Sequence, residues 1–166
     1  MIDRAIKTLK KLNDRELDLF DATLKLYHTQ KSKNDLSLNL IFDKYSEIHQ
    51  TYAELSNYNL EALKRGLFIQ WYCYTEPQYL TGIGNLKREN ENMILKNLEK
   101  IIDNKKADTE LLWMTTYYIN NDEELFKLYH DVFDFKKYLD LGENLPKIFT
   151  NSQRGQMGKY WMSIIK

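Results

Sequence analysis

The segment from Thr75 to Asn85 carries the residue types best suited to chemistry in this chain. Glu76 directly follows an aromatic stretch, and partial burial there would raise the pKa of its carboxyl group toward the range of a general acid. Ligand pockets combine apolar walls with a few convergent polar groups, and Trp71, Tyr74 and Tyr79 would supply such walls. The pattern therefore predicts a ligand-binding set made of Trp71, Tyr74, Glu76 and Tyr79.

The same segment also has a purely structural interpretation, which we favour. Tyr79, Leu80 and Ile83 supply enough apolar surface to close the end of a helical hairpin, with Glu76 left exposed to solvent. One carboxylate without a partner group does not make a reaction mechanism. We therefore predict no catalytic residue, and we keep a small enzyme or ligand-binding protein as the alternative function.

The three histidines do not form a metal-binding pattern. A metal site in a helical bundle uses Glu and His three positions apart on one helix face, and no Glu precedes His28, His49 or His130 at that spacing. The motif His-Glu-x-x-His is also absent from the sequence. We expect these histidines at the surface or at its boundary, and we predict no metal and no cofactor.

Cys73 lies near the C-terminal end of the most apolar predicted helix. The helix dipole raises the pKa of a thiol at that end, and a free Cys in such a position is usually a small buried apolar residue. Gly82 and Gly84 lack the rest of any phosphate-binding fingerprint, and no Gly-x-Ser-x-Gly motif occurs. The sequence therefore gives no support to a nucleotide-binding enzyme or a serine hydrolase.

Charge is distributed unevenly along the chain, and this is the clearest functional signal. Residues 122–134 include five acids and one Lys, with aromatic residues between them. This combination suits recognition of a basic protein, although a solvated helix face has a similar composition. The predicted partner-binding residues are Asp122, Glu123, Glu124, Asp131 and Asp134.

The C-terminal region has the opposite charge, since no acid follows Glu143. Together with Tyr160 and Trp161, its basic residues form a pattern that can pair with and stack on single-stranded nucleic acid. So few charges bind weakly, and a net charge of zero gives no long-range attraction to a polyanion. We therefore do not expect nucleic acid as the partner. The basic residues are Lys147, Arg154, Lys159 and Lys166.

Length and composition predict a single helical domain over residues 1–166. The chain has 166 residues, with 24 basic and 24 acidic side chains. Its one Cys excludes an intramolecular disulfide and fits a reducing compartment. No apolar run reaches the ~20 residues of a membrane span, and no signal-peptide pattern begins the chain. We expect a cytoplasmic protein without membrane contact.

The predicted fold class is all-α, because six Gly and two Pro leave little material for turns and apolar residues recur three and four positions apart. We expect about eight helices, in an irregular multi-helix bundle or a short array of antiparallel helical hairpins. Gly66, inside one of them, indicates a close helix crossing. The expected ranges are 2–12, 14–30, 35–55, 60–74, 86–104, 108–119, 122–133, 134–141 and 152–165.

The predicted function is that of a non-enzymatic, intracellular protein-protein interaction module. Catalytic constellations are missing, whereas uneven charge and more aromatic residues than a core requires are present. The abundance of Lys, Asn, Ile and Tyr is typical of an AT-rich bacterial coding sequence. A concrete form of the hypothesis is a small bacterial antagonist of the immunity-protein type, which neutralises a toxin by masking it.

Overall fold

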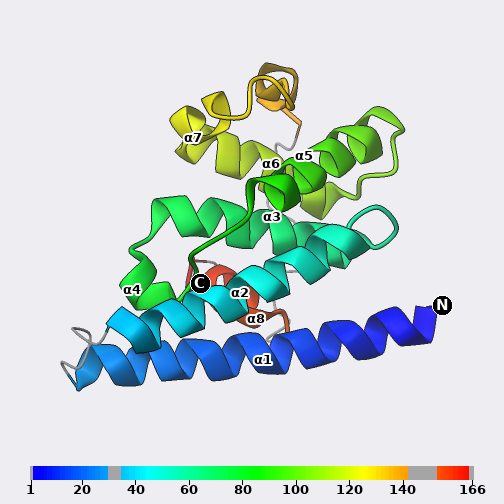
Figure 1. Ribbon diagram of the computed structural model, residues 1–166. Helices are drawn as coiled ribbons and strands as arrows, with labels where there is room; N and C mark the ends of the chain where they lie inside the picture. Colours follow the sequence, from blue (N-terminus) through cyan, green and yellow to red (C-terminus); the bar gives the residue numbers. More distant parts are fainter. Residues whose placement is uncertain (1, 30–34, 142–152, 165–166) are drawn as a thin grey trace.

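The computed structural model describes residues 2–29, 35–141 and 153–164 (Figure 1). Within these ranges the chain forms eight α-helices and one 3₁₀ helix, without a β-strand, so the predicted all-α class is confirmed. The elements are α1 (Ile2–His28), α2 (Asp35–Leu55), α3 (Leu60–Thr75), α4 (Gln78–Thr81), α5 (Arg88–Asp103), α6 (Thr109–Asn121), α7 (Glu123–Lys127), η2 (Phe135–Tyr138) and α8 (Gly155–Ile164).

The helices are stacked largely in the order of the sequence. The chain reverses direction from α1 to α2 and again from α2 to α3 (Figure 1). α5 then packs on both α2 and α3, and α6 packs on α3. α1 packs on α2, α3 on α5 and α6 on α7. α8 departs from this order, because it returns to lie against α1 and α3. This return makes the arrangement an irregular bundle.

α1 is one continuous helix, so the expected break between residues 12 and 14 was wrong. The buried side chains of Leu12, Glu16 and Thr23 keep a helical spacing through that point. Asn and Asp cost less than about 0.7 kcal/mol relative to Ala inside a helix, so packing of this stripe outweighs their capping preference. Asn13 has a different role, because its Oδ1 atom accepts a hydrogen bond from Gly155 N of α8 at 2.9 Å.

α3 is the central helix, and its middle crosses α2 and α5 closely. All residues from Ala62 to Trp71 are buried. A Cβ atom at Gly66 would lie 2.7 Å from Ile94 Cδ1 and 3.2 Å from Tyr52 Cβ, so the side chain of Ile94 and the backbone of α2 would both have to shift to admit one. The close crossing predicted from Gly66 is therefore confirmed.

The expected helix over residues 122–133 was too long, because α7 ends at Lys127. Beyond it, Leu128 N donates to Leu125 O and Val132 N donates to Tyr129 O, so the chain continues in tight turns. The intervening Asp, His and Val residues are weaker helix formers than Ala or Leu, which favours this change. The apolar residues after Lys127 are spaced as in a helix because the turns bury the side chains that a helix would also bury.

Three other boundaries also differ from the prediction. α5 begins at Arg88 instead of residue 86, and the short helix expected over 134–141 is the 3₁₀ helix η2. The last expected helix appears as α8, which begins at Gly155, while residue 152 lies outside the described residues.

Candidate functional site

Three residues of the predicted pocket point to different neighbours. Trp71 is buried and stacks on Tyr118 of α6, with ring centroids 4.6 Å apart. Tyr79 of α4 is half exposed and stacks on Tyr27 of α1, with centroids 6.1 Å apart. Glu76 is exposed to solvent directly after α3. These side chains do not converge on one cavity.

The segment between α3 and α5 packs against α1 and α2. Thr81 and Ile83 are buried. Gly82 has a φ of +73°, and a Cβ atom there would lie 2.3 Å from Thr23 Oγ1, so both its conformation and its position require glycine. Burial raises the pKa of the neighbouring Cys73 to about 12, as expected of an inert thiol. The segment has the expected packing role: Ile83 O accepts a hydrogen bond from Cys73 Sγ of α3, and the segment also packs on α1 and α2.

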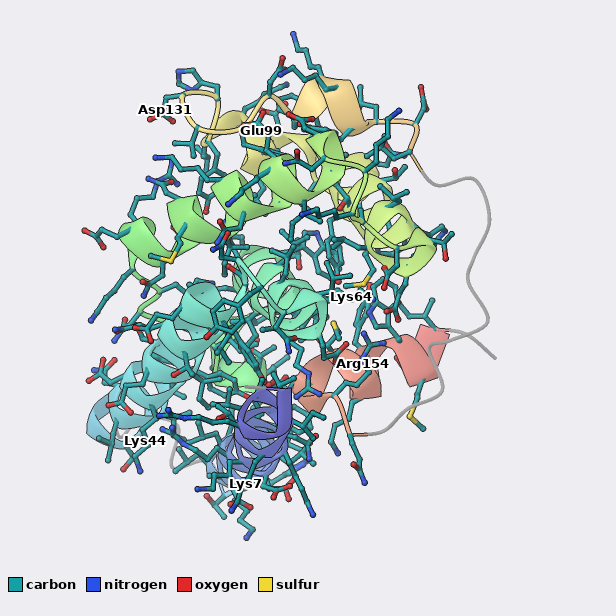
Figure 2. All side chains as sticks on the ribbon, turned by 90° about the vertical axis from the view of Figure 1, so that its right-hand side faces the viewer. Lys7, Lys44, Lys64, Glu99, Asp131 and Arg154 are labelled. Carbon is teal, nitrogen blue, oxygen red and sulfur yellow. The ribbon has the colours of Figure 1, made fainter. Side chains whose placement is uncertain are left out.

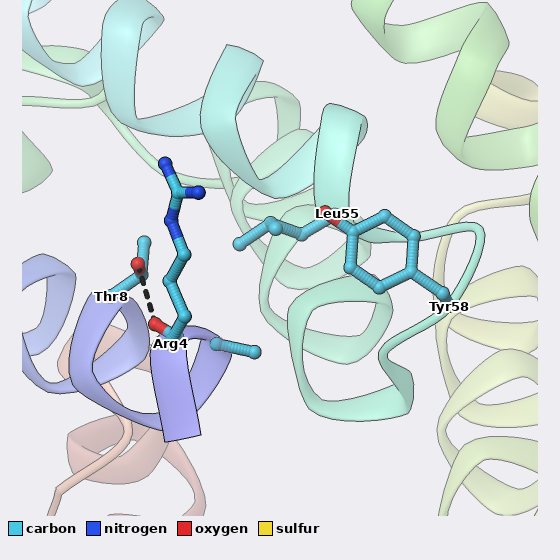
Figure 3. Close-up of a pocket in the computed structure, with 5 residues that line it drawn as sticks. Arg4, Thr8, Leu55 and Tyr58 are labelled. Carbon is cyan, nitrogen blue, oxygen red and sulfur yellow. Dashed lines mark hydrogen bonds between the residues drawn. The ribbon is translucent and has the colours of Figure 1, made fainter. Parts of the chain in front are cut away.

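Two surface hollows are large enough for a small molecule. The first, of about 450 Å³, lies between the start of α1 and the end of α2. It is lined by Arg4, Ala5, Thr8, Leu55 and Tyr58 (Figure 3). The second, of about 550 Å³, lies between α1 and α8. It is lined by Asn13, Leu17, Gln153, Lys159, Met162 and Ser163. Neither hollow is lined by a residue of the predicted pocket.

The predicted partner-binding acids lie on α7 and on the turns that follow it. We call this surface the acidic edge; it consists of Asp122, Glu123, Glu124, Asp131 and Asp134. It lies at the end of the molecule opposite α1, as the position of Asp131 in Figure 2 shows. All of its members except Asp122 are exposed. Asp122 also caps α7, because its Oδ1 atom accepts a hydrogen bond from Leu125 N at 3.1 Å.

Two lysines partly neutralise the acidic edge. Lys127 Nζ lies 2.6 Å from Glu124 Oε1 and 3.5 Å from Glu123 Oε1, and Lys137 Nζ lies 3.9 Å from Asp134 Oδ2. Exposed ion pairs of this kind are weak because water and salt screen them. Asp131, in contrast, makes no ion pair with any residue that the structure describes. The acidic edge can therefore exchange its internal lysines for the cations of a partner.

An apolar side chain stands within this acidic surface. Leu128 is 57% exposed at the end of α7. The guanidinium of Arg88, from α5, donates to Leu128 O and lies 3.8 Å from the centre of the Tyr129 ring. Phe126, Tyr129 and Phe133 are buried beneath the turn. These contacts support the backbone of the turn, from which the side chain of Leu128 extends toward solvent.

Tyr74, the fourth residue of the predicted pocket, lies beside this turn. Its hydroxyl donates to Glu91 Oε1 at 2.9 Å, and Glu91 lies 3.9 Å from Arg88. Burial raises the pKa of Glu91, while the hydrogen bond from Tyr74 opposes that shift. Burial likewise raises the pKa of Tyr74 to about 12. Through Arg88, the structure thus connects one residue of the pocket set to the turn that carries Leu128.

Two acids of α5 extend the acidic edge and were missed by the sequence reasoning. Lys137 Nζ lies 3.7 Å from Glu99 Oε1, and Tyr138 OH donates to Asp103 Oδ1 at 3.2 Å. Glu99 lies at the same end of the molecule as Asp131 (Figure 2). These groups meet through side-chain contacts between segments far apart in the chain, since Tyr138 and Asp103 are 35 positions apart, so sequence spacing carried no signal for them.

The predicted nucleic-acid pattern loses two of its members. Arg154 is 5% exposed and Trp161 is fully buried, so neither is available to a nucleic acid. Lys159 remains exposed, with its Nζ atom 5.4 Å from the centre of the Phe20 ring. Lys147 and Lys166 lie outside the described residues.

Arg154 instead belongs to a buried network of charges that joins α8 to α3 and α6. Its Nε and Nη2 atoms donate to the two oxygens of Glu61 at 2.8 and 2.7 Å, and its guanidinium also pairs with Glu110. Lys64 pairs with the same Glu110 and with Asp108 (Figure 2 labels Lys64 and Arg154). Each buried cation of the network thus contacts carboxylates, as the burial of ions requires.

Glu16 of α1 is a second part of this network. Its carboxylate accepts hydrogen bonds from Tyr52 OH at 2.6 Å and from Gln156 N at 3.1 Å. Gly155 has a φ of +60°, and a Cβ atom there would lie 2.3 Å from the Glu16 carboxyl group. Complete burial raises the pKa of Glu16 to about 7, although these hydrogen bonds and the charge of Arg65 oppose the shift. The start of α8 is therefore fitted closely onto this carboxyl group.

His49 is fully buried, so its expected surface position was wrong. Burial lowers its pKa to about 3, and the backbone of Gly66 opposes the shift, so the imidazole is neutral at physiological pH. His28 and His130 are exposed, as expected. The described residues contain no group of three or more potential metal ligands, and none of the described helices combines the length and hydropathy needed to cross a membrane.

Comparisons with protein-family models, curated proteins and solved structures gave no significant match.

Proposed function

We propose that this chain is a non-enzymatic protein-binding module that recognises a basic protein through the acidic edge. The observation that carries this proposal is an exposed apolar residue, Leu128, on a fixed turn between exposed acids. Acidic groups attract a basic partner during diffusion, and burial of an apolar side chain then slows dissociation. The combination serves both steps of binding.

Preorganisation of the turn supports the proposal. Binding is weakened by the free energy needed to order loops and side chains at an interface. Here Tyr129 and Phe133 are already buried, and Arg88 already contacts both Tyr129 and the carbonyl oxygen of Leu128. A partner would therefore meet a surface that needs little rearrangement.

The concrete form of the proposal is a cytoplasmic antagonist in a bacterium. Such a protein covers a basic functional surface of another protein, as immunity proteins cover toxins. Masking needs complementary charge and a rigid surface but no catalytic group, and the acidic edge offers both of these properties. This form rests on analogy with that class of proteins in size, helical class and charge.

An affinity-capture experiment with charge-reversal variants tests the proposal. Cell extract would be passed over the immobilised protein, over the variant Glu124→Lys/Asp131→Lys, and over the control Asp18→Lys/Asp21→Lys. Asp18 and Asp21 are exposed acids of α1, so the control changes the net charge equally at the other end of the molecule. We expect one basic protein to be retained by the first and third columns and released by salt.

The acidic-edge variant should retain that protein about tenfold less. Equal retention by both variants, or retention that salt does not affect, would show that the acidic edge is only a solvated surface.

A further inference from the structure

A group of tyrosines reaches the surface where α3, α6 and α8 meet. The rings of Tyr72 and Tyr160 meet edge to face with centroids 5.4 Å apart, and the hydroxyls of Tyr117 and Tyr160 lie 2.8 Å apart. We call Tyr72, Tyr117 and Tyr160 the tyrosine cluster. Each of its members is only partly buried, so part of each side chain contacts solvent.

Glu76 lies at the rim of the tyrosine cluster. It follows Tyr72 by one helical turn, and its backbone N–H donates to Tyr72 O at 3.1 Å. Burial is the main cause of the raised pKa of Tyr72 and of Tyr160, and the negative charge of Glu76 adds to both shifts. Glu76 thus lies one turn beyond Tyr72, whose ring contacts that of Tyr160.

Among the residues that the structure describes, no cation pairs with Glu76 beside these groups. Glu76 is exposed and has no salt bridge within the part of the chain that the structure describes. The two cation–aromatic contacts among the described residues lie elsewhere, on the rings of Tyr129 and Phe20. The C-terminal end of α3 adds the negative end of a helix dipole.

We infer that Glu76 and the tyrosine cluster form a binding site for an Arg or Lys side chain presented by a protein partner. Aromatic rings attract cations placed near them, and a neighbouring carboxylate adds a charge-assisted hydrogen bond. Tyrosines suit this role at a surface, because the hydroxyl end stays hydrated while the ring binds.

This inference deepens the proposed function, on which it rests for the basic character of the partner. Tyr72 and Tyr74 are two positions apart on α3, so they project to different sides of the helix. Tyr74 contacts Glu91 on the side of the acidic edge, whereas Tyr72 belongs to the tyrosine cluster. A basic partner that covers the end of α3 would thus meet two separate cation-binding surfaces.

An NMR titration with small probes tests the site without the partner. The ¹⁵N-labelled protein would be titrated with Nα-acetyl-arginine amide and with Nα-acetyl-citrulline amide, which has a similar shape but no charge. We expect the arginine compound to shift the amide signals of residues 72–76 and 160, with a dissociation constant on the order of millimolar. The citrulline compound should leave these signals in place.

Two variants make the test specific. Glu76→Gln should weaken binding of the arginine compound at least about threefold, whereas the α1 control Asp18→Asn should leave it unchanged. Equal shifts with both compounds, or binding that Glu76→Gln does not weaken, would overturn the inference. Such a failure would leave the acidic edge untouched, and failure of the charge-reversal capture would leave this binding site untouched.

Discussion

The acidic edge and the network beneath α8 use the same residue types in opposite ways. At the acidic edge, Lys127 and its two glutamates stay largely in solvent. In the network, Arg154 and Glu110 expose only 6% and 4% of their side chains. Water screens the first set and is excluded from the second, so charge holds α8 in place in one region and remains available to a partner in the other.

Under the proposed function, burial rather than residue type separates the charges that stabilise the fold from those that would bind a partner. A buried charge that loses its partner is strongly destabilising, whereas an exposed one changes stability little. Substitutions in the two regions should therefore differ in their effect on unfolding, on salt dependence and on association.

The largest effect should come from Arg154→Met. It removes the cation shared by Glu61 and Glu110, so we expect the free energy of unfolding to fall by about 3–5 kcal/mol. The matched control is Arg15→Met, which breaks an exposed pair with Glu47. Urea denaturation measures both variants, and equal small losses would erase the contrast between the two regions.

The pH dependence of stability should report on Glu16. Its folded pKa of about 7 lies above the ordinary value of 4.5, so the folded state binds the proton more tightly. The stabilisation linked to this proton is complete below pH 4.5 and is lost as the pH rises to 7. The loss amounts to about 3 kcal/mol.

Glu16→Gln removes this ionisable group. Relative to the variant, the wild type should therefore lose stability between pH 4.5 and 7, and denaturation at several pH values measures the difference. Parallel stability curves for the two proteins would contradict the raised pKa.

A smaller effect is expected at Tyr74, an exposed residue whose hydroxyl contacts a buried carboxylate. Tyr74→Phe removes the hydroxyl that donates to the buried carboxylate of Glu91, so stability should fall by about 1 kcal/mol. Thermal unfolding measures this change. Tyr58→Phe serves as the control, because Tyr58 is 66% exposed, and a loss as large in the control would remove the special role of Glu91.

The smallest effect should be that of Lys127→Ala. Lys127 is exposed and neutralises Glu123 and Glu124, so its removal should leave the unfolding transition in place and raise the association rate of a basic partner about twofold. Stopped-flow mixing with the captured partner measures this rate. A slower association would mean that Lys127 itself contacts the partner.

Local signals explain how much of the fold the sequence predicts. Apolar spacing predicts the all-α class, and Gly66 indicates the close crossing. Both signals can be read from a single stretch of the sequence. The expected break in α1 was wrong because Asn13 and Asp14 are also capping residues, and tertiary packing decided between their two roles. The network beneath α8 was not predictable, since Arg154 and Glu61 are 93 positions apart.

The candidate site likewise has a part that the sequence predicts and a part that it does not. A run of acids along the chain identifies the acidic edge, because its members are close in sequence. The two acids added from α5, Glu99 and Asp103, depend on packing between distant segments. The contact between Tyr72 and Tyr160 likewise requires α8 to return beside α3.

The most direct test of the central claim is the association rate of the captured basic partner with the wild type and with Glu124→Lys/Asp131→Lys. We expect the wild-type rate to fall at least about tenfold when NaCl rises from about 0.05 to 0.5 M. The variant should start near the lower rate and unfold at the same urea concentration as the wild type. Equal rates for both proteins at low salt would contradict the assignment of partner recognition to the acidic edge.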